Sequence, residues 1–130
     1  MLVLDASVVV SACVVPGGFD EFGEEQLIAP PLLWSEARSV VHEATWRGDV
    51  DREDARATHA RLERCPVARR EHERLGYEAW RIADDFGWAR TYDAEYVALA
   101  LLVGCRLVTL DARLRRATDR LGFVVSPAEL

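Results

Sequence analysis

Two short apolar runs in this chain are each closed by an aspartate and followed at once by a helical pattern. Asp5 closes the run at residues 2–5, and Asp111 follows the run at residues 106–110. Runs of this length and composition are typical of buried parallel strands, which have helices packed on both faces. Because strand and helix patterns alternate along the rest of the chain, we expect an α/β fold with a parallel β-sheet flanked by α-helices.

Proline and glycine residues divide the sequence into the elements of this fold. The chain has 130 residues and is half apolar, enough to fill one core, so we expect a single domain over residues 1–130. Further strands are expected at residues 27–29 and 123–125, and a short strand or an extended link is expected at residues 67–68. Helices are expected at residues 6–14, 32–46, 51–65, 71–86, 91–103 and 112–121, with a short helix or loop at residues 19–26.

Four acidic residues occupy positions that such a fold brings to one edge of the sheet. Asp5 and Asp111 stand at strand ends, whereas Glu36 and Asp93 lie near the starts of helices. Ligands of open parallel sheets bind outside the carboxyl ends of the strands, so we expect the four carboxylates to converge there. Clustered carboxylates repel one another unless a cation holds them together, and an all-oxygen site favours Mg²⁺ or Mn²⁺.

Short motifs surround these four acids. The chain opens with Asp5-Ala6-Ser7, carries Glu36 in its second main helix, begins a later helix with Tyr92-Asp93-Ala94, and ends a strand with Val108-Thr109-Leu110-Asp111. In this order and at this spacing, the four segments resemble the PIN-domain nucleases, in particular the VapC ribonuclease toxins of bacterial toxin–antitoxin pairs. The resemblance extends over essentially the whole chain and depends on the four motifs together, because each motif alone is short.

The resemblance implies an endoribonuclease that hydrolyses RNA phosphodiester bonds with Mg²⁺ or Mn²⁺. The catalytic and metal-binding residues that it implies are Asp5, Glu36, Asp93 and Asp111. It also implies inhibition by a small antitoxin, a homodimer, and a heterotetramer or larger assembly with that antitoxin. The antitoxin is expected in a helix-lined groove within residues 6–46. Some relatives have a further acid after the fourth one, where this chain has Ala112 and Arg113, so the number of metal ions stays open.

The same side chains also have purely structural explanations. Aspartate is among the best helix N-cap residues, so Asp5, Asp93 and Asp111 could each cap a helix. The two roles are compatible, because an N-cap carboxylate is held ionised. The hydroxyl of Ser7 could bond the backbone of the first helical turn or support the site by facing Asp5. Thr109 could be an ordinary strand residue or direct its hydroxyl toward the same site.

Several other residues are candidates for simpler roles. Glu36 would be solvent-exposed if it did not serve a metal site. Glu95 lies two residues after Asp93, off the same helical face, and is expected to be a solvated acid and not a fifth ligand. The histidines have no metal-binding spacing and are expected to be solvated or in the core; they are His42, His59 and His72.

The basic and aromatic residues suggest only limited contact with nucleic acid. The net charge is −6, and all 16 residues counted as Lys or Arg are Arg, which suits bidentate phosphate contacts. One or two arginines of the helix after Asp111 are expected beside the site; the candidates are Arg113, Arg115, Arg116 and Arg120. The tryptophans are expected in the core or at interfaces; they are Trp34, Trp46, Trp80 and Trp88.

Some alternatives are excluded and others stay open. Response-regulator receivers and haloacid-type phosphatases need a Lys beside the phosphate, which this chain lacks, and no P-loop or dinucleotide-binding glycine motif occurs. A catalytically silent PIN-fold binding module stays open, as does a metal-dependent DNA nuclease or phosphatase. No membrane span or leader peptide is recognisable, and three cysteines without CxxC spacing suit a reducing compartment, so we expect a cytoplasmic protein.

Overall fold

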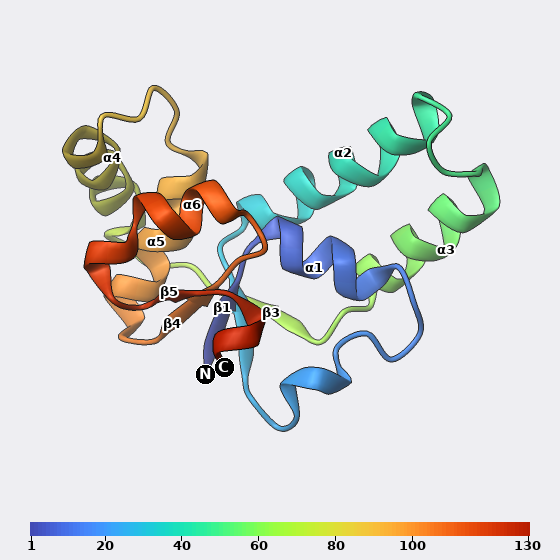
Figure 1. The fold of residues 1–130 in the computed structure, drawn as a ribbon, viewed down its shortest axis with the longest axis horizontal. Helices are drawn as coiled ribbons and strands as arrows, with labels where there is room; N and C mark the ends of the chain where they lie inside the picture. Colours follow the sequence, from blue (N-terminus) through green and yellow to red (C-terminus); the bar gives the residue numbers. More distant parts are fainter.

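The computed structural model describes residues 1–130 and has the α/β architecture expected from the sequence (Figure 1). Five parallel strands form one sheet in the order β3-β2-β1-β4-β5. The strands are β1 (Leu2–Leu4), β2 (Leu27–Ala29), β3 (Val67–Arg69), β4 (Arg106–Val108) and β5 (Val124–Val125). Each of the five regions expected to contain a strand therefore does so.

The strand β1 lies at the centre of the sheet, where the direction of strand addition reverses. Strands β2 and β3 lie on one side of β1, and β4 and β5 lie on the other. Leu4 of β1 is in register with Val108 of β4, so the two strands end side by side. Both residues are fully buried, as expected for central parallel strands covered on both faces. The carboxyl ends of β1 and β4 therefore form the switch point of an open parallel sheet, where ligands bind.

Six α-helices surround this sheet, and α1 to α3 lie on the opposite side of Figure 1 from α4 to α6. The helices are α1 (Ala6–Cys13), α2 (Leu32–Trp46), α3 (Arg52–Glu63), α4 (Leu75–Phe86), α5 (Tyr92–Val103) and α6 (Ala112–Ala117). Helices α2 and α3 run antiparallel and extend away from the sheet (Figure 1). Helix α5 packs against β1 and β4, and its residues 96–100 are almost completely buried.

Some element bounds differ from the expected ones because side chains replace regular backbone bonding. Strand β1 stops one residue early at Leu4, where Asp5 begins the cap of α1, although the extended Asp5 still donates its backbone N–H to the Val108 carbonyl at 3.2 Å. The helix expected at residues 71–86 begins only at Leu75. Ahead of it, the His72 ring accepts a hydrogen bond of 3.0 Å from the Arg74 backbone N–H, which forms a turn outside the helix.

The helix expected at residues 112–121 is divided in a similar way. Helix α6 ends at Ala117, and a 3₁₀ turn follows over residues 119–121. Between them, the buried hydroxyl of Thr118 donates to the Leu114 carbonyl at 2.7 Å. The same carbonyl also accepts a hydrogen bond of 3.1 Å from the Thr118 backbone N–H, so Thr118 bonds twice to the last turn of α6.

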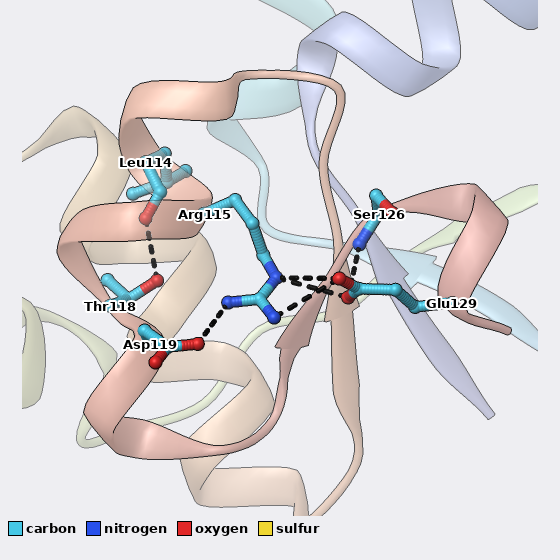
Figure 2. A network of polar contacts seen from close by, with 6 residues as sticks. All are labelled: Leu114, Arg115, Thr118, Asp119, Ser126 and Glu129. Atoms are coloured by element: carbon cyan, nitrogen blue, oxygen red, sulfur yellow. Dashed lines mark hydrogen bonds and ion pairs between the residues drawn. The ribbon is translucent and has the colours of Figure 1, made fainter.

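The C-terminal end of the chain is held against α6 by one arginine. Figure 2 shows the Arg115 guanidinium between two carboxylates, at 2.7 Å from Asp119 and 3.0 Å from Glu129. Glu129 also accepts a hydrogen bond from the Ser126 backbone N–H at 3.0 Å. Arg115, one of the arginines considered for phosphate contact, is therefore occupied with fixing the last turn of the chain.

One hydrophobic core of 29 buried residues joins the sheet to the helices. It includes the alanines of α5, whose small side chains let that helix approach the sheet closely. The three cysteines, Cys13, Cys65 and Cys105, form no disulfide. None of the helices combines the length and apolar character needed to cross a bilayer.

Candidate functional site

Asp5 stands directly after β1, at the start of α1, and is almost completely buried, with 6% of its surface exposed. One of its carboxylate oxygens accepts a hydrogen bond from the Val8 backbone N–H at 3.1 Å and another from the Ser7 hydroxyl. The second oxygen accepts a hydrogen bond from the buried Thr109 hydroxyl. Asp5 is therefore the N-cap of α1, as expected from the preference of aspartate for this position. The hydroxyls of Ser7 and Thr109, the two expected supporting residues, both contact it.

Asp111 follows β4 and caps α6. Its carboxylate accepts hydrogen bonds from the backbone N–H groups of Arg113 at 2.9 Å and Leu114 at 3.2 Å. Its own backbone N–H donates to the Thr109 hydroxyl at 3.0 Å. Because the same hydroxyl donates to Asp5, it links the two aspartates at the ends of β1 and β4.

The Ser7 hydroxyl makes a second connection between these strand ends. It donates to Asp5 and accepts a hydrogen bond of 3.0 Å from the Leu110 backbone N–H. The two hydroxyls together fix the β1–α1 junction against the β4–α6 junction. They therefore hold two acidic N-caps in a defined relative position.

Glu36 projects from the second turn of α2 and is half-buried. Its carboxylate accepts a hydrogen bond of 2.9 Å from the phenol of Tyr96, a residue of α5 that is only 1% exposed. Tyr96 was not among the site residues expected from the sequence. A signal was present, since Tyr96 follows Asp93 by three residues and therefore shares its helical face.

Asp93 lies in the first turn of α5, and it does not cap this helix. The N-cap residue is Thr91, which makes no capping hydrogen bond through its side chain. The expectation that Asp93 could be a helix N-cap is therefore wrong, whereas Asp5 and Asp111 are both N-caps. A carboxylate at this helix end is still favoured by the positive end of the helix dipole.

These acids meet at a cleft of about 740 Å³, which we call the acidic cleft. Glu36, Asp93 and Asp111 line it, while Asp5 is buried beside them at the end of the neighbouring strand. Its other lining residues include two arginines, Arg90 and Arg113, and two aromatic residues, Trp88 and Tyr92. The acidic cleft thus has carboxylates next to the switch point of the sheet and a cationic wall, formed by the two arginines and the two aromatic residues.

Burial and mutual repulsion raise the pKa values of these carboxyl groups. Burial raises the pKa of Asp5, against hydrogen bonds from Ser7, Thr109 and Val8 that lower it, and the charge of Asp93 adds to the increase. For Asp93, loss of solvent inside the cleft is the largest cause, followed by the charge of Asp111. The negative charges therefore oppose one another across the site.

The pKa of Glu36 is raised in the same way. Burial is the largest cause, the hydrogen bond from Tyr96 lowers the pKa, and the charges of Asp93, Asp5 and Glu95 raise it. Glu95 is itself half-buried, with a pKa raised by burial. Glu95 is therefore less solvated than expected, whereas its exclusion as a fifth ligand stays a prediction.

The donor groups fit a hard divalent cation. No set of three or more His, Cys, Asp or Glu side chains lies close enough to form a ready-made metal cage. The four acids nevertheless offer only oxygen ligands, and backbone N–H bonds hold Asp5 and Asp111 in place. A cation between the carboxylates would remove the repulsion that raises their pKa values.

The remaining candidate residues lie elsewhere. His42 and His59 line a separate cleft between α2 and α3, and His72 forms the turn before α4. Trp46 and Trp80, expected in the core or at an interface, are 82% and 68% exposed and are therefore not core residues; an interface position stays a prediction.

Comparison with known proteins agrees with this architecture. The family model described as PIN domain matches residues 2–120. Similar proteins include VapC ribonuclease Mb0985 of Mycobacterium bovis and ribonuclease VapC9 of Mycobacterium tuberculosis, each 33% identical over 115 residues, which are 88% of this chain and 88% of the relative. The crystal structure of PAE2754 from Pyrobaculum aerophilum has a TM-score of 0.77 at 23% identity, covering 98% of this chain and 90% of that chain.

Proposed function

The chain belongs to the PIN-domain family, with VapC proteins among its relatives, and on this basis we propose that it is a metal-dependent endoribonuclease. The observation that supports the proposal is one cleft lined by the carboxylates of Glu36, Asp93 and Asp111, with Asp5 at the neighbouring strand end of the sheet's switch point. We propose further that residues 1–130 act as one PIN domain. RNA phosphodiester bonds are the substrate.

Asp5, Asp93 and Asp111 would hold Mg²⁺ or Mn²⁺, with Glu36 beside them. When bound, such an ion lowers the pKa of water and offsets the charge that develops on the phosphate. The chain itself keeps the ligands in place, because Ser7 and Thr109 fix the carboxylate of Asp5 through hydrogen bonds. Both hydroxyls are pre-arranged before any ligand enters.

Glu36 is the residue best placed to accept a proton from the attacking water. Its pKa is raised by burial, which makes its carboxylate a stronger base than an exposed one. The phenol of Tyr96 donates to one oxygen and leaves the other free to accept from water. Attack on phosphorus then transfers one proton from water to Glu36, and the leaving ribose oxygen takes a proton from solvent.

The cationic wall of the acidic cleft would position the substrate. Arg90 and Arg113 line this cleft, and neither is engaged in an ion pair. Free guanidinium groups suit bidentate contact with phosphate oxygens. Of the four arginines expected near Asp111, Arg113 is thus the one assigned to RNA contact.

A small antitoxin is the proposed partner. An apolar groove of about 360 Å³ lies between α1, α2 and α3, next to the elements that carry Asp5 and Glu36. Val14, Val40 and Val50 line it and are 56%, 44% and 38% exposed. An amphipathic segment of the antitoxin would cover these valines, and its basic side chains would be attracted by the net charge of −6. Homodimers of the chain would form a heterotetramer or larger assembly with it.

Cleavage of labelled RNA and DNA of the same sequence, with Mg²⁺, Mn²⁺ or chelator, tests the activity. Metal-dependent cleavage of RNA alone supports the proposal. Cleavage of DNA at a similar rate would indicate a DNA nuclease, and release of phosphate from monoesters alone would indicate a phosphatase. Neither activity, together with stable binding of a partner, would indicate a catalytically silent module. Co-expression with a small adjacent gene, followed by purification through one partner, tests the antitoxin.

A further inference from the structure

The pair formed by α2 and α3 carries a second cleft, which shares only Val41 and Ala55 with the apolar groove. This basic cleft has a volume of about 620 Å³, and none of its nine lining residues is Asp or Glu. The arginines that line it are Arg38, Arg52 and Arg56, and the other polar or aromatic ring side chains are His42, Trp46 and His59. Three arginines in one cleft without a lining acid are unusual in a chain with a net charge of −6.

Two of its arginines are free to bind an anion. Arg38 and His59 share the carboxylate of Glu63, at 2.6 Å and 2.9 Å. Arg52 and Arg56 take part in no ion pair. They are four residues apart on α3 and therefore lie on one helical face, directed to the same cleft. Arg52 also begins α3, a position where the helix dipole disfavours a cation, so local helix stability does not explain it.

The aromatic member of the basic cleft is unusually accessible. Trp46 is the last residue of α2 and is 82% exposed, more than any other large apolar side chain of the chain. An indole ring in this state offers a flat face to a planar ligand. Arginines that bind phosphate beside an aromatic face are the combination that binds single-stranded nucleic acid without regard to sequence.

The basic cleft lies within reach of the acidic cleft along one helix. Trp46 follows Glu36 by ten residues of α2, a distance of about 15 Å along the helix axis. At a rise of about 3.4 Å per nucleotide, roughly four or five stacked nucleotides span this distance. A strand cleaved beside Glu36 could therefore continue onto Trp46.

We infer that the basic cleft binds a single-stranded segment of the RNA substrate near the cleaved bond, with phosphates on Arg52 and Arg56 and a base on Trp46. The inference rests on the proposed ribonuclease function. A peptide is the less suitable occupant, because the cleft has few apolar side chains, whereas the apolar groove has eight apolar residues among its eleven. The basic cleft and the apolar groove thus serve different ligands.

Binding of a fluorescent single-stranded RNA to the full chain in chelator, followed by anisotropy over a range of salt concentrations, tests the inference. The double variant Arg52→Gln/Arg56→Gln is expected to bind more weakly and to lower the salt slope by about 1.4, the value for two single-strand phosphates. Trp46→Ala is expected to weaken binding about tenfold, and Trp46→Phe is expected to retain most of it. The matched control is Arg70→Gln/Arg106→Gln, which removes two exposed arginines outside the cleft and should leave affinity near that of the parent.

The outcomes separate this inference from the proposed function. Normal RNA affinity in the cleft variants, with cleavage by the parent, overturns the inference and leaves the ribonuclease proposal intact. RNA binding that is lost in the cleft variants, with no cleavage by the parent, supports the cleft and overturns the ribonuclease proposal. An equal loss of RNA affinity in the control double variant would show a general effect of charge and would overturn the assignment of the basic cleft to RNA binding. Unchanged RNA affinity with lost partner binding would assign the cleft to an acidic peptide instead.

Discussion

The acidic cleft and the basic cleft are built in opposite ways. At the acidic cleft, Asp5 and Asp111 follow strand ends, and the hydroxyls of Thr109 and Ser7 join these two junctions. The arginines and the tryptophan of the basic cleft are exposed side chains on two helices that extend from the sheet, around the buried residues Val41 and Ala55. The proposed catalytic residues, which need exact positions, are therefore anchored to the sheet. The proposed contacts with a flexible RNA strand lie on surface helices.

This difference predicts unequal sensitivity to substitution, and the acids should show the largest effect. Asp5→Asn, Asp93→Asn and Asp111→Asn each remove a charge and little volume, so the fold should survive. Each is expected to reduce RNA cleavage by more than the roughly 10–100-fold typical of residues around a metal site. Initial rates at saturating Mg²⁺, with circular dichroism as a check of folding, measure the effect. Near-normal turnover in any two variants would remove these residues from the active site.

A smaller effect is expected at Tyr96, which positions Glu36 without touching substrate. Tyr96→Phe removes the hydrogen bond that lowers the pKa of Glu36, so that pKa should increase further. We expect kcat to fall about tenfold with little change in KM, as for other positioning residues. The acid limb of the pH profile of kcat should also move to higher pH. A fall in kcat with an unmoved pH profile would mean that Tyr96 acts only through packing.

The two clefts also differ in how far the sequence could predict them. Asp5 and Asp111 end apolar runs, and their position at the switch point follows from the alternation of strands and helices. The bond between Tyr96 and Glu36 joins residues sixty positions apart, and no local pattern encodes such a pair. The exposure of Trp46 was not predicted either, because a tryptophan is usually covered and only the projection of α2 and α3 leaves this one free. Whether the four acids are catalytic stays a prediction.

The acidic cleft should also be the less stable of the two regions in the absence of metal. Burial raises the pKa of Asp5 in the folded chain above its value of about 3.9 in the unfolded chain. The folded state therefore binds this proton more tightly. The resulting stability is complete below the unfolded value and is lost as pH rises through the folded pKa.

Asp5→Asn removes this titration and keeps an acceptor oxygen for the cap of α1. In chelator at pH 7, we expect the variant to equal or exceed the parent in stability, by about 1 kcal/mol, and the difference to shrink toward pH 4. Mg²⁺ or Mn²⁺ should raise the melting temperature of the parent more than that of the variant. Thermal unfolding at several pH values measures both effects. A variant that melts far below the parent in chelator would show that capping dominates the role of Asp5.

The smallest effect is expected at Arg115, whose sequence position resembles that of Arg113 but whose contacts do not. Arg113 lines the acidic cleft, whereas Arg115 is held by Asp119 and Glu129 (Figure 2). Since exposed ion pairs contribute little, Arg115→Gln should lower the melting temperature by no more than about 4 °C. RNA affinity should stay at the level of the parent, while Arg113→Gln should weaken it and lower its salt dependence. Equal losses of affinity in the two variants would mean that the whole α6 face, and not the cleft wall alone, contacts RNA.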